Sequence, residues 1–221
     1  MATLFQLFFI KFVVMNKYSV VVPTLWMSRK LEAMMPIYYD LADEIIIIDN
    51  HPKKRFIHDK RIKYLTKNHN IFVNPAWNWG ACEARNDRLI IANDDVVIPH
   101  LAELIEAFDK SNYDIIGSDI RGCHNDKQVS LNPVFQMPWG WGCFMLMRKS
   151  AYYPIPEEFK IWFGDNVLFL NNLRRGTFSG IQLITEMSET LRHGFMQQAR
   201  SEEPLFKQWF NENYKSLHHQ F

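Results

Sequence analysis

Two adjacent acids stand where a buried apolar strand is expected to end. The run Arg88–Ala92 (RLIIA) is followed at once by Asn93, Asp94 and Asp95. Neighbouring carboxylates repel each other unless something neutralises them, and a hard divalent cation prefers carboxylate oxygens. Such a metal could also hold a diphosphate and stabilise it as it leaves. The structural alternative is a turn or a helix cap, because acids suit the N-terminus of the helix expected at Pro99–Lys110.

Two further predicted strands end in polar residues. Lys17–Val22 (KYSVVV) leads to Pro23-Thr24, and the isoleucine run Ile45–Ile48 leads to Asp49. In open α/β sheets, ligands bind outside the carboxyl ends of the strands, so all three strand ends should share one crevice. Asp49 could accept hydrogen bonds from ribose hydroxyls or from the edge of a base, or it could cap its loop.

The stretch Asn78–Asn86 (NWGACEARN) combines residues that suit phosphate binding. Gly80 allows a close backbone approach or a tight turn. Arg85 can approach a phosphate, and Asn86 offers both donor and acceptor groups. A helix that carries a surface arginine and an asparagine is the alternative.

Aromatic residues stand next to glycine or acid at two places. Pro138–Cys143 (PWGWGC) interleaves Trp139 and Trp141 with glycines, which suits a loop against which a sugar ring can stack, or a packed aromatic turn. Asp165 follows Trp162-Phe163-Gly164. A carboxylate in a partly apolar site can have a raised pKa and act as a general base, although this position also suits a helix N-cap.

The remaining reactive side chains form no clear motif. His193 (in LRHGF) could be a third metal ligand or contact a diphosphate, or it could be structural. Cys82, Cys123 and Cys143 are odd in number and match no zinc or CxxC spacing. We expect them to be reduced in a reducing compartment such as the cytoplasm.

Strands and helices are expected to alternate along the first half of the chain and so to position these residues. The expected strands are 17–22, 45–48, 62–65, 71–73, 88–92, 113–116 and 143–147. The expected helices are 28–43, which Ser28 caps, a helix that residues 78–86 lead into, 99–110, and 165–175, which Gly176 ends. This alternation predicts an α/β fold with a mostly parallel central sheet flanked by helices.

Length and charge narrow the possible domain organisation and the possible partners. The 221 residues suit one domain, which we place at 16–221, after an apolar leader or first strand at 1–15. The apolar part of that leader, 4–14, is shorter than the roughly 20 residues of a membrane-spanning helix, although attachment to a membrane surface stays open. A net charge of +1 gives no reason to expect nucleic acid as a partner.

Taken in order, these motifs resemble those of the GT-A glycosyltransferases, especially the broad inverting family 2 kind. The matching stretches, within about residues 17–195, are SVVVPT (19–24), EIIIIDN (44–50), NWGACEARN (78–86), IIANDDVVIP (90–99), WGCFMLMRKSAY (141–152) and FGDNVLFLNNLRRG (163–176). The resemblance implies a Rossmann-like GT-A fold and transfer of a sugar from a nucleotide-sugar donor, a UDP-sugar, to a glycan or protein-linked acceptor.

The resemblance also implies roles for single residues. Asp95, with His193 as a further ligand, would bind Mn2+ or Mg2+, which bridges to the donor phosphates. The donor itself would contact Pro23, Thr24, Asp49, Asn78, Gly80, Arg85, Asn86 and Asp94. Trp139, Trp141, Gly142 and Trp162 would pack against the acceptor or the sugar. Asp165 would be the catalytic base that deprotonates the acceptor hydroxyl.

The chain departs from the family pattern in several ways. Asn93 replaces the first acid of the DxD motif, and Gly164 leaves Asp165 as one carboxylate where the family has a pair. Inversion with Asp165 as base is favoured over retention. The chain is also short for the family, which fits a minimal enzyme of the viral or phage type or one domain of a longer protein.

Two other functions compete with this interpretation. A sugar-phosphate nucleotidyltransferase would carry a Gly-rich loop after the first strand, but residues 24–30 (TLWMSRK) contain no glycine. A non-catalytic nucleotide or glycan binder would follow if Asn93 and Gly164 marked a decayed site.

Overall fold

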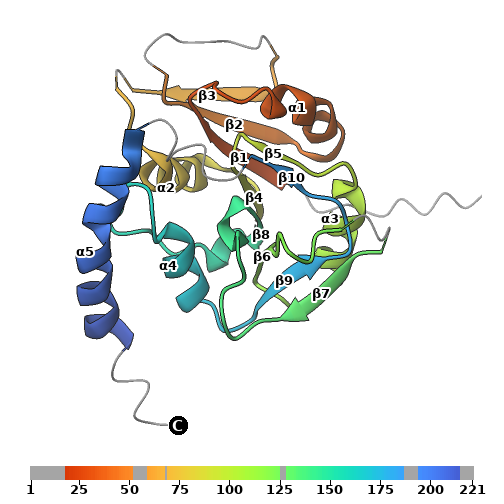
Figure 1. Ribbon diagram of the computed structural model, residues 1–221. Helices are drawn as coiled ribbons and strands as arrows, with labels where there is room; N and C mark the ends of the chain where they lie inside the picture. Colours follow the sequence, from red (N-terminus) through yellow and green to blue (C-terminus); the bar gives the residue numbers. More distant parts are fainter. Residues whose placement is uncertain (1–17, 52–58, 68, 125–127, 187–193, 215–221) are drawn as a thin grey trace, which may run out of the picture.

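A computed structural model describes residues 18–51, 59–67, 69–124, 128–186 and 194–214 (Figure 1). The predicted leader and His193 lie outside these residues, and the division of the chain at residue 16 stays a prediction. The described residues contain an eight-stranded sheet in the order β3-β2-β1-β4-β8-β6-β9-β7. Its strands are β1 (Tyr18–Thr24), β2 (Glu44–Asp49), β3 (Ile62–Thr66), β4 (Arg88–Ala92), β6 (Ile115–Ser118), β7 (Ser130–Pro133), β8 (Phe144–Arg148) and β9 (Arg175–Ser179).

The sheet is mostly parallel, as the sequence predicts. β3, β2, β1 and β4 are parallel neighbours, and β9 is parallel to β6. β8 runs antiparallel between β4 and β6, and β7 is antiparallel to β9 at the edge. Every residue of β1 and β2 is buried, which explains why these strands read as unbroken apolar runs. The predicted α/β fold is therefore confirmed.

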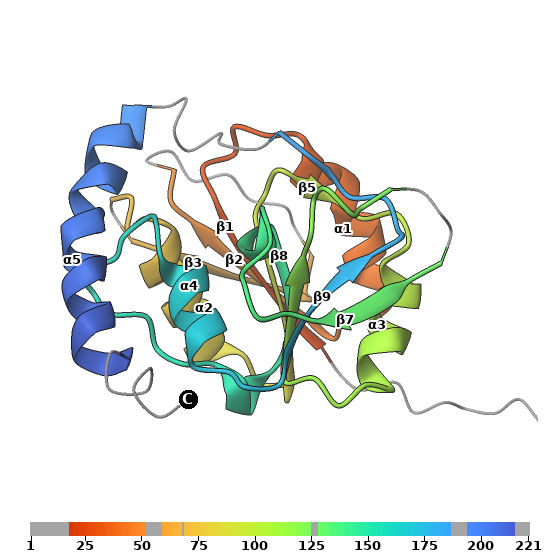
Figure 2. The same ribbon diagram turned by 60° about the horizontal axis from the view of Figure 1, so that its bottom comes forward.

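Helices cover both faces of the sheet (Figures 1 and 2). α1 (Lys30–Leu41) and α3 (Leu101–Asp109) pack on one face, where Val20 and Val22 point. α2 (Val73–Glu83) and α4 (Gly164–Leu170) pack on the other face, where Val21 points. α5 (Met196–Tyr214) lies outside α2 and α4 and adds aromatic rings to that second core. Short 3-10 turns at Trp141–Cys143 and Lys149–Ala151 flank β8.

The expected strand at 71–73 is wrong, because Val73 is the first residue of α2. The apolar triplet is followed by Asn74-Pro75, and proline is well tolerated in the first turn of a helix. The N-cap of α1 also differs from the prediction: it is Arg29 rather than Ser28, and the helix begins at Lys30. The Ser28 hydroxyl still accepts the Lys30 backbone N–H at 3.1 Å.

The expected helix at 165–175 is too long. α4 ends at Leu170, and the chain returns to the sheet as β9. Gly176 lies inside this strand and does not cap a helix. A Cβ atom on Gly176 would stand 2.9 Å from the Asn132 carbonyl oxygen and 3.0 Å from the Tyr113 ring, so glycine permits a close approach between strands here.

A small second sheet lies beside the strand ends. It pairs β5 (Val96–Val97) antiparallel with β10 (Ile184–Thr185). Within the described part of the chain, no helix has both the length and the apolar character needed to cross a membrane.

Candidate active site

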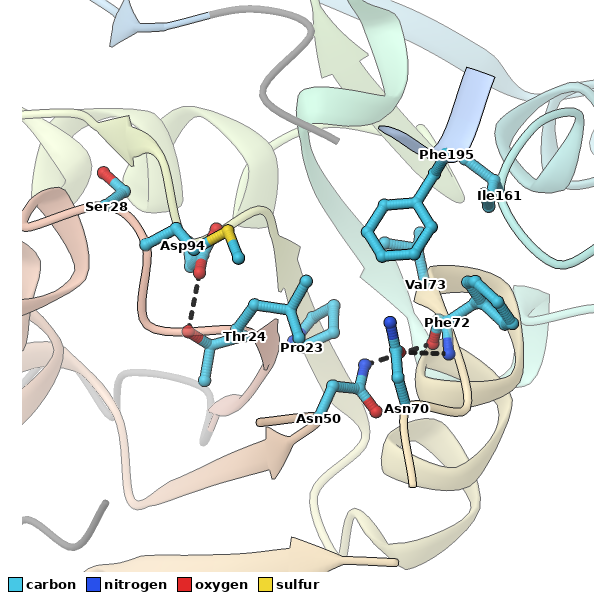
Figure 3. Close-up of a pocket in the computed structure, with 12 residues that line it drawn as sticks. Pro23, Thr24, Ser28, Asn50, Asn70, Phe72, Val73, Asp94, Ile161 and Phe195 are labelled. Atoms are coloured by element: carbon cyan, nitrogen blue, oxygen red, sulfur yellow. Dashed lines mark hydrogen bonds between the residues drawn. The ribbon is translucent and has the colours of Figure 1, made fainter. Parts of the chain in front are cut away.

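Two connected pockets open where β1, β2 and β4 end. Parallel register places Thr24 beside Asp49. The main pocket, of about 680 Å3, is lined by Pro23, Val73, Trp77, Asn93, Asp94, Asp95, Arg121, Met137, Pro138, Trp139, Gly140, Gly142, Cys143, Ile161, Trp162, Phe163, Asp165 and Asn166. The side pocket is lined by Pro23, Thr24, Leu25, Met27, Ser28, Asn50, Asn70, Phe72, Val73, Asp94, Ile161 and Phe195 (Figure 3). The two pockets share Pro23, Val73, Asp94 and Ile161.

Asp94 stands at the junction of the pockets. The Thr24 hydroxyl donates a hydrogen bond of 2.6 Å to its carboxylate, as Figure 3 shows. Burial raises the pKa of Asp94 to about 6, and the charge of Asp95 adds to the rise, while the bond from Thr24 opposes it. Asp94 therefore keeps its proton to a higher pH than an exposed aspartate does.

Asp95 is almost fully buried and lines the main pocket beside Asp94. The Thr185 hydroxyl of β10 donates a hydrogen bond of 3.1 Å to Asp95, so the small second sheet helps to hold this acid. The neighbouring Asn93 Oδ1 is buried and has no hydrogen-bond partner among the described residues. These residues contain no cluster of three or more His, Cys, Asp or Glu that could hold a metal.

Asp165 is the third acid of the main pocket. It is the second residue of α4, and burial raises its pKa. The backbone N–H groups of Asn166, at 3.0 Å, and of Gly142 donate to its carboxylate. A Cβ atom on Gly142 would lie 2.5 Å from the Asp165 Cβ, so glycine is required for this close approach. Gly142 therefore supports the acid; it also lines the main pocket, so its packing against a sugar stays a prediction.

The predicted aromatic wall is only partly present. Trp139, which is 56 % exposed, and Trp162 both line the main pocket. Trp141 is fully buried, its Nε1 donates to the Gly176 carbonyl at 2.9 Å, and its ring meets Phe169 edge-on. The interpretation of Trp141 as a sugar-stacking residue does not fit this burial, because its ring fills the core.

Two residues predicted to bind the donor instead hold α2 in place. A Cβ atom on Gly80 would lie 2.3 Å from the Val21 side chain, so glycine here lets α2 pack closely on β1. The Asn78 amide donates to the Ile155 carbonyl at 2.7 Å and accepts from the Tyr152 hydroxyl at 2.8 Å. Neither residue lines the main pocket or the side pocket.

Arg85 and Asn86 lie at the opposite edge of the sheet. Arg85 Nε is 3.8 Å from the carboxylate of Glu44, the first residue of β2. The Asn86 amide donates to the Ser19 hydroxyl near the start of β1, at 3.1 Å. The prediction that Arg85 and Asn86 contact the donor does not fit this position, because ligands bind at the carboxyl ends of the strands.

At the end of β2, Asn50 rather than Asp49 lines the side pocket. Asp49 is buried and accepts the His51 backbone N–H at 3.0 Å, as expected of a loop cap. Asn50 Oδ1 accepts the Ile71 backbone N–H at 3.2 Å, which ties this strand end to the loop before α2.

Sequence reasoning missed several pocket residues, among them Trp77, Asn70, Arg121 and Phe195. No local motif marks them, since Trp77 looks like an ordinary core residue of a helix. Backbone strain does mark the site. The non-glycine residues with positive φ are Trp26 (58°), Phe72 (67°) and Phe163 (65°) among those described. Phe72 and Phe163 line the pockets, and Trp26 lies between two residues of the side pocket, which agrees with the tendency of strain to gather at functional sites.

Solved glycosyltransferase structures share this fold. S. aureus TarS 1-349 aligns with a TM-score of 0.55 and 15 % identity over 76 % of this chain and 59 % of that one. Its complex with UDP-GlcNAc aligns with a TM-score of 0.53 and 13 % identity over 76 % and 57 %. GalNAc-T7 with UDP, GalNAc and Mn2+ aligns with a TM-score of 0.55 and 12 % identity over 76 % and 43 %. The chain thus spans under two thirds of each of these proteins.

No curated protein matches the chain. The family model described as "Glycosyl transferase family 2" matches residues 13–132, which is 120 of the 221 residues and more than half of the chain. The matched region carries β1 to β6 together with Asp94 and Asp95. The chain belongs to glycosyl transferase family 2.

Proposed function

We propose that the chain transfers a sugar from a UDP-sugar donor to a hydroxyl group of a glycan or protein-linked acceptor, with the help of a divalent cation. The observation that carries this proposal is the presence of three acids, Asp94, Asp95 and Asp165, around one pocket at the carboxyl edge of the sheet. The UDP-GlcNAc in a TarS structure and the UDP and Mn2+ in a GalNAc-T7 structure support it by analogy of fold.

The side pocket suits the nucleoside part of the donor. Asn50 and Asn70 bring amide groups to it, and the rings of Phe72 and Phe195 meet edge-on with centroids 5.6 Å apart (Figure 3). Because Asp94 lines both pockets, a donor that spans them would pass its diphosphate beside this carboxylate. The nucleobase would thus lie in the side pocket beside the Asn50 and Asn70 amides, and the sugar would lie in the main pocket.

The residues around Asp94 suit a divalent cation that is bound partly by the protein and partly by the donor. The adjacent carboxylates of Asp94 and Asp95 supply hard oxygen ligands. Burial raises the pKa of Asp94, and the charge of Asp95 adds to the rise, so a cation would favour the ionised form of both acids. Since the described residues offer no third acid or histidine in the cluster, diphosphate oxygens would complete the coordination. A bound Mn2+ or Mg2+ would offset the charge that develops on the departing diphosphate.

Asp165 suits the role of catalytic base. Its ionised carboxylate takes the proton of the acceptor hydroxyl while that oxygen bonds to the anomeric carbon. The bond from this carbon to the diphosphate oxygen breaks, and UDP leaves with the bonding electrons. Burial raises the pKa of Asp165, which makes its carboxylate a stronger base than an exposed one. Attack opposite the leaving group inverts the anomeric centre.

A thermal-shift panel tests the donor site. UDP, UDP-GlcNAc, UDP-GalNAc, UDP-glucose and UDP-galactose would each be added with and without Mn2+. Ligands that bind the folded state raise the Tm by mass action. We expect UDP or a UDP-sugar to raise it only with Mn2+, and Asp95→Ala to abolish the rise. Asp87→Ala is the matched control, because Asp87 is exposed and precedes β4 at its opposite end.

The outcomes separate the competing functions. Donor hydrolysis that depends on Mn2+ and is lost in Asp165→Asn supports a transferase. Binding without any turnover would favour a non-catalytic nucleotide or glycan binder. If no nucleotide shifts the Tm of the native chain, the proposed function fails.

A further inference from the structure

The indole N–H groups of three tryptophans differ in how they are paired. Trp141 Nε1 donates to the Gly176 carbonyl at 2.9 Å. The Trp79 side chain is hydrogen-bonded to Glu83. Trp77 Nε1 has no hydrogen-bond partner among the described residues, although the side chain is only 4 % exposed.

An unpaired N–H group of this kind is costly, because the group gives up its hydrogen bonds to water and gains none from the protein. Native proteins contain few such groups, so each one calls for a specific reason. Trp77 lies in the first half of α2 and lines the main pocket beside Asp94, Asp95 and Asp165. A ligand in this pocket would supply the missing partner.

A second unpaired atom lines the same pocket. Asn93 Oδ1 is buried and has no partner among the described residues. An indole N–H can only donate a hydrogen bond, whereas an amide oxygen can only accept one. A diphosphate could satisfy Trp77 but not Asn93, and a cation could satisfy Asn93 but not Trp77. A hydroxyl group both donates and accepts, and a sugar ring carries several of them.

We propose that Trp77 Nε1 and Asn93 Oδ1 bind hydroxyl groups of the sugar that the donor carries, and so help to set which sugar is accepted. This inference rests on the proposed function. The transferred sugar must lie between the diphosphate at Asp94–Asp95 and the base at Asp165, and all three acids line the pocket that Trp77 and Asn93 also line. Asn93 directly precedes Asp94, so its oxygen belongs to the donor end of the pocket.

Binding measurements on the full chain with Mn2+ test the inference. UDP and the UDP-sugar that most stabilises the native chain would be titrated into the native protein, Trp77→Phe and Trp79→Phe. Loss of one hydrogen bond should weaken UDP-sugar binding by about fivefold to tenfold in Trp77→Phe. Binding of UDP, which lacks the sugar, should stay unchanged. Trp79→Phe is the control, because this residue lies on the same helix and its N–H pairs with Glu83 outside the main pocket.

A second replacement separates the N–H group from the size of the ring. β-(3-Benzothienyl)alanine at position 77 keeps the shape of the indole but lacks the N–H, so it should keep or raise the Tm of the free protein, because a costly unpaired group is removed, and still weaken UDP-sugar binding. The same analogue at position 141 should lower the Tm, because it leaves the Gly176 carbonyl unpaired. The inference is overturned if UDP and UDP-sugar affinities change equally at position 77, or if neither changes. If the native chain binds no UDP-sugar, the proposed function fails first and the inference falls with it.

Discussion

The ring of Phe163 lies flat on the ring of Phe206, with centroids 4.3 Å apart and planes inclined by 6°. Phe163 is in the wall of the main pocket, immediately before α4, and Phe206 is on α5. The positive φ of Phe163 costs a non-glycine residue on the order of 1 kcal/mol, which a packing contact must offset. The C-terminal helix therefore stabilises the strained segment that leads to Asp165.

Glu202 of α5 fixes the same wall through hydrogen bonds. Its fully buried carboxylate accepts the backbone N–H groups of Ile161, at 3.1 Å, and Trp162, at 2.9 Å. We expect Glu202→Gln to lower the free energy of unfolding by about 1–3 kcal/mol, because an amide nitrogen would face a backbone donor. Thermal or urea unfolding measures the loss.

Glu203→Gln is the matched control for this prediction, since Glu203 is the exposed neighbour on the same helix. Its Tm should stay close to that of the native chain. Equal effects of the two substitutions would show that Glu202 does not hold the pocket wall.

Strands of the sheet could be predicted where burial on both faces leaves an uninterrupted apolar run. The predicted Arg88–Ala92 coincides with β4, and Ile45–Ile48 lies within β2. The segment 71–73 looks similar but has no strand partner and starts α2 instead. β9 could not be predicted from the local sequence, because Arg175–Ser179 becomes a strand through pairing with β6 and β7, which lie far away in sequence.

The candidate site could be predicted in part for a similar reason. Parallel strands carry their carboxyl ends to one edge, so Thr24 and Asp94 were expected to meet, and they are hydrogen-bonded. The direction of α2 explains why some residues lie in other places than the sequence predicted. α2 returns from the carboxyl edge to the amino edge, so Trp77 in its first half reaches the pocket, whereas Arg85, just after its end, reaches Glu44.

The ionisation of Asp165 should control both activity and stability. As a base it works only when ionised, so kcat/KM should fall as the pH drops through its raised pKa. A carboxyl group whose folded pKa is raised stabilises the folded state at low pH, and this contribution is lost as the pH rises from the unfolded to the folded pKa. Asp165→Asn should therefore lower transfer by about 10²–10⁴-fold, yet keep or raise the Tm at pH 7.5. A Tm well below native would indicate a structural role instead.

Metal binding at Asp94 should depend on pH around 6. The folded pKa of about 6 means that protons compete with the cation below that value. The protonated carboxyl stabilises the free protein at low pH, and this contribution fades as the pH rises from about 4, the usual value of an aspartate, towards the folded pKa. Mn2+ with UDP should thus raise the Tm clearly at pH 7.5 and far less at pH 5. An equal rise at both values would place the cation elsewhere.

Arg85 and Arg121 should behave in opposite ways, although the family resemblance favours Arg85 as the donor contact. The Arg85 side chain is 68 % exposed and donates to the Asp43 carbonyl at 3.0 Å, at the amino edge of the sheet. Arg121 lines the main pocket, where a guanidinium group can pair with a phosphate. We expect Arg121→Ala to weaken Mn2+-dependent UDP binding several-fold, and Arg85→Ala to leave it unchanged with a small shift in Tm. Calorimetric titration of both variants measures this contrast. Loss of UDP binding in Arg85→Ala alone would mean that the donor binds at the other edge of the sheet, and the proposed site would have to be abandoned.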